Sequence, residues 1–374
     1  MHLDDKNRVK NSTSVFKIRI LFSLDEKISN KTKTIRQEFR MNKGILALGA
    51  MLILGVNTSS NAAKVCVFDL LGKSGEAYKM IEEWALAAKV WRGDIDLISY
   101  QNEAQAEKDF QQGKCDGVYM TSMRARTYNK FAGSVDAIGA VPTYAIARKA
   151  ISFALDKRNQ RRLVSRDGNQ SYEVAGISEI GLAYIFVRDK KINTIEKIKG
   201  KKFAVLGYDE AQKIVVRSLG GQAVLSDISD IAKKFNSGQA DIMAAPAYAY
   251  KPLELYKGLV EDGAIITFPA VNMTMDLIIR PEKFASNFGQ NSRDWFLGRL
   301  KSNFTLIQRM EADLPAKYKI NLSQEDKTRY QQILREARIS LTKRDIYDST
   351  MMSVLKRARC TVERTNFECS LGGE

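Results

Sequence analysis

A seven-residue pattern, F-x-x-G-x-x-D, occurs twice in this chain, at residues 110–116 and 235–241. Each copy follows a strand–helix–strand–helix succession and leads into a further apolar strand. Alternating strands and helices of this kind form a parallel sheet with right-handed crossovers, so the sequence predicts two similar α/β lobes. The expected elements are 64–71, 77–91, 95–100, 103–112 and 115–120 in the first lobe, and 202–207, 209–219, 223–225, 228–236 and 240–245 in the second.

Two long apolar runs, 172–188 and 265–279, stand on either side of the second succession. The first run is suited to carry the chain from one lobe to the other, and the second to carry it back. Two such crossings would form a hinge between the lobes.

The last ninety residues have the pattern of helices. Two capped helix starts are expected, at Ser323-x-x-Asp326 and at Thr342-x-x-Asp345. Before them runs one apolar stripe, which we interpret as core: Trp295, Phe296, Leu300, Phe304, Ile307 and Met310.

Residues 43–64 have the three parts of a secretory signal: a lysine, an uncharged core of 13 residues at 44–56, and the small-residue ending Asn61-Ala62-Ala63. A membrane anchor would need about 20 apolar residues, and a buried core helix is the other alternative. Met41 is then a possible start. Residues 1–40, with ten Lys and Arg, would be a basic extension that is untranslated or removed, or else a basic arm for nucleic acid or anionic lipid.

The formal net charge is +16, but Lys and Arg are dispersed and form no basic block with interleaved aromatics. No nucleic-acid partner is therefore expected. The single histidine, His2, precedes the predicted cleavage site. The exported chain is thus without histidine-based triads and histidine-ligated metal sites, and it has no G-x-S-x-G motif. We expect no enzyme activity, no catalytic residue, no metal and no cofactor.

The four cysteines, Cys66, Cys115, Cys360 and Cys369, form no C-x-x-C pair, which argues against a zinc site. An even number of cysteines in an exported chain favours disulfides, with free buried thiols as the alternative. Cys66 and Cys115 are expected to join adjacent strands of the first lobe, and Cys360 and Cys369 to close a short terminal loop. Spacing alone does not fix this connectivity.

The second lobe opens with I-N-T-I-E-K-I-K-G-K-K-F-A-V-L-G at 192–207, followed by G-G-Q-A-V at 220–224. With the signal, the two lobes, the two crossings and the helical tail, these motifs resemble type II periplasmic solute-binding proteins. They are especially similar to the solute receptors of TRAP transporters, the DctP-like family. The resemblance covers most of residues 64–280. It implies an α/β, two-lobed type II periplasmic binding protein fold with two βαβαβ lobes, a hinge and a helical C-terminal tail.

Three positions depart from that family. The resemblance implies an arginine after the K-G-x-K run that binds a substrate carboxylate bidentately, and this position holds Ala204. A second arginine is missing after Gly181, and the asparagine expected before Pro246 is Ala245. These departures count against the usual organic-acid ligand more than against the receptor architecture.

We expect the following division of the chain: a basic extension at 1–40, a cleavable signal at 41–63, lobe 1 at 64–177, lobe 2 at 178–270, and a return crossing with a helical tail at 271–374. The tail is expected to pack mainly on lobe 1.

Ligands of α/β sheets gather where strands end, and polar residues follow several of the expected strands. Lys73 and Ser74 precede a helix whose N terminus is able to hold an anion. Arg124 or Arg126 is placed to supply a cation, whereas Glu179 at the first crossing is placed to bind an amine. Each residue also has an ordinary structural interpretation, as a turn, a surface charge or core packing. The candidate ligand-binding residues are Lys73, Ser74, Thr121, Ser122, Arg124, Glu179, Tyr208, Asp209 and Tyr248.

We therefore expect a periplasmic receptor that captures a small organic solute in the cleft between its lobes and presents it to inner-membrane transporter subunits. An envelope enzyme on an α/β scaffold is one alternative, since fold alone does not determine function. A receptor-derived structural or signalling partner without transport is the other.

Overall fold

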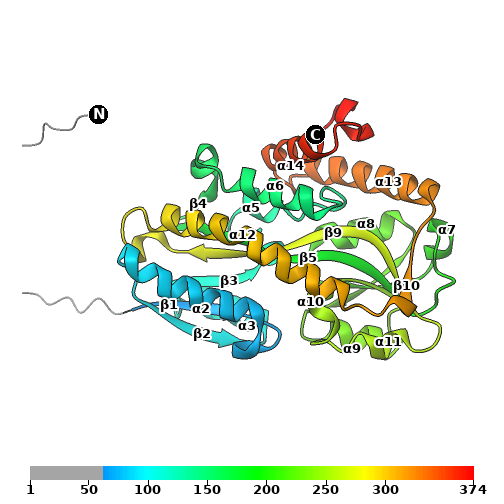
Figure 1. The fold of residues 1–374 in the computed structure, drawn as a ribbon, viewed down its shortest axis with the longest axis horizontal. Helices are drawn as coiled ribbons and strands as arrows, with labels where there is room; N and C mark the ends of the chain where they lie inside the picture. Colours follow the sequence, from blue (N-terminus) through cyan, green and yellow to red (C-terminus); the bar gives the residue numbers. More distant parts are fainter. Residues whose placement is uncertain (1–61) are drawn as a thin grey trace, which may run out of the picture. The chain divides into compact units, whose positions relative to one another are not determined.

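Two long strands run through both lobes in the computed structural model, which describes residues 62–374 (Figure 1). β5 (Gln170–Val187) has 18 residues and β9 (Ala264–Ile279) has 16, where about 5–6 residues is usual. They pair antiparallel within a ten-stranded sheet of order β2-β1-β3-β9-β5-β8-β6-β7. These strands are the two predicted crossings. The predicted basic extension and the signal segment up to residue 61 lie outside the described residues.

Lobe 1 is built on β1, which pairs parallel with both β2 and β3. β3 then pairs antiparallel with the C-terminal half of β9. The stripe expected on the first helix is buried at Ala77, Ile81, Trp84 and Ala88. The elements of this lobe are β1 (Ala63–Phe68), η2 (Gly72–Ser74), α2 (Glu76–Ala88), η3 (Lys89–Trp91), β2 (Ile95–Tyr100), α3 (Glu103–Gln111) and β3 (Gly117–Thr121).

Lobe 2 repeats this plan. β6 pairs parallel with β7 and β8, and β8 pairs antiparallel with the C-terminal half of β5. The elements are α7 (Ile195–Ile198), β6 (Lys202–Leu206), α8 (Glu210–Ser218), β7 (Gln222–Ser226), α9 (Ile231–Asn236), β8 (Ile242–Pro246), α10 (Ala247–Tyr250) and α11 (Tyr256–Leu259).

The structure explains why F-x-x-G-x-x-D occurs in both lobes. The two phenylalanines are fully buried, and the glycines have φ of 73° and 80°, which ends each helix in the left-handed region. Each aspartate then forms a hydrogen bond with the backbone of the neighbouring parallel strand. Asp116 Oδ2 accepts a hydrogen bond from Lys64 N, and Asp241 Oδ2 accepts one from Lys202 N, both at 2.9 Å. Because each aspartate precedes its strand, β3 and β8 begin two residues later than predicted.

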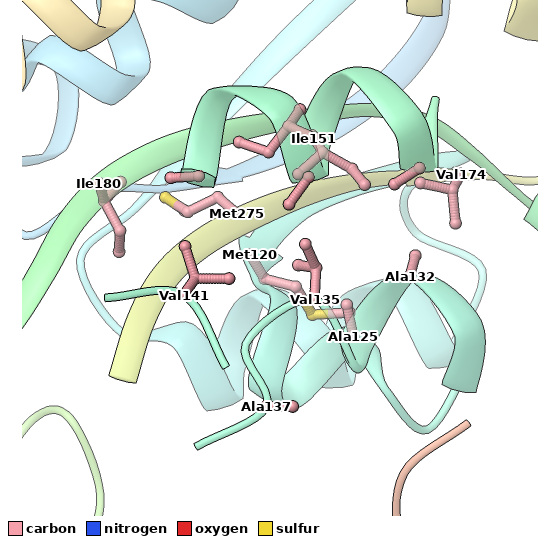
Figure 2. Close-up of a cluster of buried hydrophobic side chains, with 14 of the residues drawn as sticks. Met120, Ala125, Ala132, Val135, Ala137, Val141, Ile151, Val174, Ile180 and Met275 are labelled. Atoms are coloured by element: carbon pink, nitrogen blue, oxygen red, sulfur yellow. The ribbon is translucent and has the colours of Figure 1, made fainter. Parts of the chain in front are cut away.

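Helices between β3 and β5 form a part of lobe 1 that the sequence analysis did not predict. They are α4 (Ser122–Ala125), α5 (Lys130–Gly133), α6 (Tyr144–Ala154) and η4 (Lys157–Leu163), after which β4 (Val164–Asp167) forms a hairpin with β5. Figure 2 shows the core under α6, where Ile151 faces Val174 of β5, Met275 of β9 and Val135.

The C-terminal tail is helical, as predicted. α12 (Phe288–Ala312) packs on β5 and buries Phe296, Leu300, Phe304 and Ile307. α13 (Gln324–Lys343) contacts α8, and α14 (Ser349–Val362) lies against α5 and α6 (Figure 1). The remaining short elements are η5 (Pro281–Lys283), η6 (Ala316–Tyr318), β10 (Lys319–Ile320) and η7 (Phe367–Ser370).

One of the two predicted helix starts in the tail is right and the other is wrong. Ser323 caps α13, since its hydroxyl accepts a hydrogen bond from Asp326 N at 3.0 Å. Thr342 lies inside the last turn of α13, and its hydroxyl donates to Arg338 O. The next helix starts later because the Asp348 carboxylate accepts a hydrogen bond from Met351 N.

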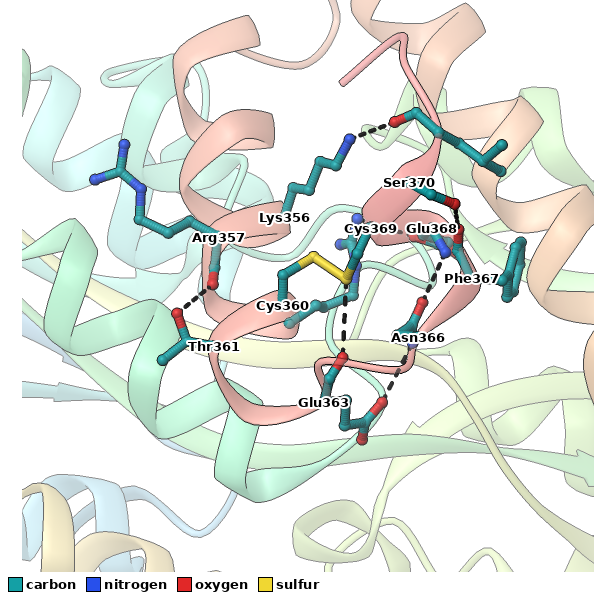
Figure 3. The surroundings of a disulfide bond; sticks show 12 residues. Lys356, Arg357, Cys360, Thr361, Glu363, Asn366, Phe367, Glu368, Cys369 and Ser370 are labelled. Carbon is teal, nitrogen blue, oxygen red and sulfur yellow. Dashed lines mark hydrogen bonds and ion pairs between the residues drawn. A yellow bond between two sulfur atoms is a disulfide. The ribbon is translucent and has the colours of Figure 1, made fainter.

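The cysteines form disulfides as predicted, Cys66 with Cys115 and Cys360 with Cys369. All four cysteines are therefore in disulfides. The second disulfide ties η7 to α14 (Figure 3). Beside it, Arg338 and Arg359 make buried ion pairs with Glu368 and with Glu374, the last residue. The two arginines also donate to Ile138 O and Ala140 O of lobe 1. The C terminus is therefore held against the loop that follows α5. No helix among residues 62–374 is long and apolar enough to cross a membrane.

Candidate functional site

The two lobes contact each other where the strands of both end. Five side-chain hydrogen bonds join them there, one of them from Gln212 Nε2 to Met123 Sδ at 3.4 Å. In the other bonds, Arg124 donates to Asp227 and Arg126 donates to Asp209. The hydroxyl of Tyr208 donates to Glu103, and that of Tyr248 donates to Asp69. Four of the nine candidate residues therefore hold the lobes together in this structure: Arg124, Tyr208, Asp209 and Tyr248.

Arg124, at the end of β3, has all three guanidinium nitrogens paired with carboxylates. Nε donates to Glu103 at 2.8 Å, Nη1 to Glu107 at 2.7 Å and Nη2 to Asp227 at 2.8 Å. The guanidinium also stacks on the Tyr208 ring, 3.8 Å from its centroid. Burial opposes the charge, but Glu103, Tyr208 and Glu107 together outweigh it and raise the pKa of Arg124. Arg124 thus joins the lobes in this structure, and its role in ligand binding stays a prediction.

The second arginine, Arg126, is mostly buried and forms an ion pair with Asp209. Its Nη1 donates to Asp209 Oδ1 at 3.1 Å and its Nε to Gly133 O at 2.8 Å. Asp209 also caps α8, because its Oδ1 accepts a hydrogen bond from Ala211 N. This charge pair links the end of β6 in lobe 2 to α4 of lobe 1.

A carboxylate of the chain itself occupies the helix N terminus where an anion was predicted. Asp69 accepts hydrogen bonds from Leu71 N at 2.8 Å and Tyr78 N at 3.1 Å, in the first turn of α2. A third comes from the Tyr248 hydroxyl of lobe 2, at 2.7 Å. Lys73 and Ser74 are exposed and line none of the three cavities described below. Their role in ligand binding stays a prediction.

Ser122 belongs to a buried chain of four oxygens between lobe 1 and β9. Ser122 Oγ lies 2.5 Å from Asp276 Oδ1 and 2.7 Å from Thr274 Oγ1, which lies 2.6 Å from Asp136 Oδ1. Three hydrogen bonds need three protons, and the two hydroxyls supply two. One of the two carboxyl groups must therefore hold the third proton.

The environment of both carboxyl groups agrees with this proton count. Burial raises the pKa of Asp276 to about 7, against the opposing effects of Ser122 and Arg126. Burial also raises the pKa of Asp136 well above its ordinary value, and repulsion from Asp276 adds to the shift.

Glu179, on β5, is opposite Thr274 in the ladder and is also buried. Its Oε1 accepts a hydrogen bond from Gly181 N at 2.8 Å, but Oε2 has no partner within the described chain. Burial raises the pKa of Glu179 well above its ordinary value, and the Asp136 charge raises it further. Asn272, on β9 nearby, has no hydrogen-bond partner for either amide atom among residues 62–374.

A cavity of about 170 Å³ lies beside these groups, between the lobes, and extends into lobe 2. Lobe 1 contributes Asp69, Thr121 and Asp136 to its wall, and lobe 2 contributes Asp209 and Tyr248. Most other lining residues are apolar. Ala204 and Ala245, where the family resemblance implies carboxylate-binding residues, also line it. Among the described residues, no lysine or arginine does so.

Two further cavities are less suited to a solute. One of about 260 Å³ lies between α2 and α12 and is bordered by Lys79, Glu83 and Arg299. Of the candidate residues, Glu179 and Tyr248 also line it. An open surface hollow of about 560 Å³ in lobe 1 is bordered by Lys130, Arg158, Arg161 and Arg162. In the described part of the chain, no group of three or more His, Cys, Asp or Glu side chains is arranged to hold a metal ion.

Sequence reasoning missed Asp136, Asn272, Thr274 and Asp276. Asp136 lies in a loop after an unpredicted helix, so no local signal marked it. The other three were visible, since they occupy alternate positions of the apolar run 265–279. Three polar residues on one face of an otherwise apolar strand mark a polar surface inside the protein.

Comparison with known proteins gives one family and one fold. A profile of the family described as "Solute-binding protein AdeT 1/2" matches residues 83–374. The chain is 43% identical over 308 residues to "Probable solute-binding protein AdeT1" of Acinetobacter baumannii, covering 82% of this chain and 100% of that protein. It is 30% identical over 239 residues to "Probable solute-binding protein AdeT2" of the same organism, covering 64% and 99%.

Solved structures with the same fold include a TRAP periplasmic solute binding protein from Desulfovibrio salexigens with bound orotic acid. Its TM-score is 0.65 at 13% identity, over 81% of this chain and 98% of that one. Another, from Haemophilus influenzae with bound L-gulonate, has a TM-score of 0.63 at 11% identity, over 79% and 99%. The predicted two-lobed fold and the resemblance to TRAP receptors are confirmed.

Proposed function

Because the chain belongs to the AdeT 1/2 family of solute-binding proteins, we propose that it is a periplasmic receptor that captures a small organic solute between its lobes. It then presents the closed, loaded form to membrane transporter subunits. The fold that it shares with TRAP receptors supports this proposal.

The observation that carries the proposal is the cavity at the lobe interface. Residues of both lobes line it, and polar contacts between the lobes surround it, including Tyr248 with Asp69 and Arg126 with Asp209. A solute in this cavity would contact both lobes at once, and its binding energy would favour the closed form. The two long strands β5 and β9 provide the connections about which the lobes would turn.

The finer assignments are also part of this proposal. We place lobe 1 at 64–177, lobe 2 at 178–270, and the return crossing and tail at 271–374. Export to the periplasm is supported by the two disulfides. Of the candidate residues, Thr121, Asp209 and Tyr248 are proposed to line the solute cavity, with Ser122 behind its wall. Glu179 lines the cavity between α2 and α12 instead. Arg124 and Tyr208 are proposed to close the lobes.

A melting screen of the exported protein against small organic solutes tests the proposal. One solute or one group of related solutes should raise Tm in a dose-dependent manner and be recovered chemically unchanged. Chemical conversion of the stabilising compound would favour the enzyme alternative. If no solute raised Tm, the structural or signalling alternative would replace transport.

A further inference from the structure

We propose that the interlobe cavity binds an organic cation, with a protonated amine or similar group facing its acidic wall and an apolar body beside its aliphatic lining. This inference rests on the proposed receptor function and names the chemical class of its solute.

The charges around the cavity have one sign. The charged residues that line it are Asp69, Asp136 and Asp209, and no lysine or arginine of the described chain joins them. Behind this wall lies one more buried carboxyl group, that of Asp276. Arg126 lies beside this cluster and forms an ion pair with Asp209. This acidic interior complements a cationic ligand.

Two buried acceptors in the cluster have no donor within the described chain. Asp276 Oδ2 has no hydrogen-bond partner, although its residue is 0% exposed. The Thr121 hydroxyl, on the cavity wall, has none either, and its residue is 2% exposed. Buried oxygens of this kind are normally satisfied, because leaving them unpaired is unfavourable. An ammonium or amidinium group supplies N–H donors and the opposite charge together.

The proton count in the chain from Asp136 to Asp276 agrees with a cationic ligand. In this structure one proton beyond those of Ser122 and Thr274 is needed to complete the hydrogen bonds. A bound cation would stabilise both carboxylates in their ionised form. The proton would then leave to solvent, so binding should release protons.

The rest of the wall suits the apolar part of such a solute. Ile180, Met273, Met275 and Phe268 line the cavity, together with the ring of Tyr248. Aromatic faces attract cations, and methionine adapts to different apolar shapes. A metal ion fits less well, because no described group of three carboxylates converges on one point.

Three probes of nearly equal size and shape test the proposal on the exported protein: phenethylamine, phenethyl alcohol and hydrocinnamate. They carry an ammonium, a hydroxyl and a carboxylate on the same phenylethyl body. Phenethylamine should raise Tm by about 2–4 °C at tenfold its Kd, and bind at least about tenfold more tightly than the other two. Titration calorimetry in buffers of different ionisation enthalpy should show proton release.

Asp276→Asn tests the site itself. It replaces Oδ2, which has no partner, by an amide and keeps the Oδ1 that accepts from Ser122, so the fold should persist. This variant should bind phenethylamine at least about tenfold more weakly. Asp136→Asn is the second variant, with the same expected loss. Asp262→Asn is the matched control, because its side chain is 75% exposed on lobe 2, and it should bind as the unsubstituted protein does.

The outcomes separate this inference from the proposed function. Preference for hydrocinnamate, equal binding of the three probes, or no response to phenethylamine at about 10 mM overturns the cation inference. The receptor function then still stands if another class of solute raises Tm. Failure of every small solute overturns both.

Discussion

The Arg124 side chain was selected from the sequence because it follows a strand end, and it does lie at the lobe interface. Its partners are Glu103 and Glu107 of α3 and Asp227 after β7, which is 103 residues away in sequence. No local pattern reveals such partners. The sequence could therefore locate the residue but not distinguish a ligand-binding arginine from a latch.

Replacing Arg124 separates these two roles. Arg124→Gln leaves Glu103 buried without its cation and should lower the free energy of unfolding by about 3–5 kcal/mol. Arg299→Gln is the control, since its pair with Glu83 is about half exposed and contributes under about 1 kcal/mol. Urea unfolding of both variants measures the difference. Equal stabilities would show that Arg124 is not a structural latch.

Asp276 gives a pH prediction with a defined sign. Burial raises its pKa from 3.8 to about 7 in the folded protein, so the folded state binds this proton more tightly than the unfolded state. Its contribution to stability is therefore greatest at low pH and is lost as the pH rises from about 4 to about 7. The groups that face it are Ser122, Thr274, Asp136 and Arg126.

Asp276→Asn cannot ionise and makes this dependence measurable. The variant should match the original protein below about pH 4 and be more stable by about 2–4 kcal/mol near pH 8. Thermal unfolding across this range gives the comparison. A difference that is independent of pH, or that grows as the pH falls, would contradict the assigned sign.

Among the elements, the repeated strands and helices of the two lobes were predictable because each has its own apolar period and helix end. The α4–α6 region was not, since its short helices are specified by contacts with β5, β9 and α14. The start of α14 was missed for a related reason. Thr342 and Asp345 imitate a cap, but the apolar face of α13 continues through Leu341, which is fully buried.

Substituting alanine for two glycines, Gly176 of β5 and Gly298 of α12, should change the stability of the protein in opposite directions. A Cβ on Gly176 of β5 would meet the Phe296 ring of α12 at 2.2 Å, whereas one on Gly298 has no neighbour within 4 Å. Gly176→Ala should therefore destabilise the protein by about 1–3 kcal/mol through overpacking. Gly298→Ala, inside the exposed face of α12, should stabilise it by about 0.5–1 kcal/mol. Chemical denaturation of both variants checks the signs, and a stable Gly176→Ala protein would refute the close contact.

The two disulfides should contribute unequally. Cys66 and Cys115 are 49 residues apart and Cys360 and Cys369 are 9 apart. Chain entropy gives about 4 kcal/mol for the longer loop and about 2.5–3 kcal/mol for the shorter. Paired Cys→Ala variants, unfolded in denaturant, measure each contribution. The reverse order would mean that the loop closed in the unfolded chain does not determine the effect.

At the scale of the whole molecule, the fold followed from the sequence and the solute site did so only in part. The doubled α/β pattern and the two long apolar runs are properties of successive residues, and they specified two lobes and their connections. The cavity depends on which side chains of the two lobes meet. Its acidic wall joins Asp69, Asp136 and Asp209, and none of these is close to another in the sequence.

The central claim is that the protein holds a small solute between its lobes without changing it. A crystal structure of the exported protein with the solute that raises its Tm tests this claim most directly. We predict one intact molecule in the interlobe cavity, in contact with Asp136 of lobe 1 and Tyr248 of lobe 2, with a cationic group toward Asp136 and Asp276. A solute bound outside this cavity, or found as a reaction product, would contradict the claim.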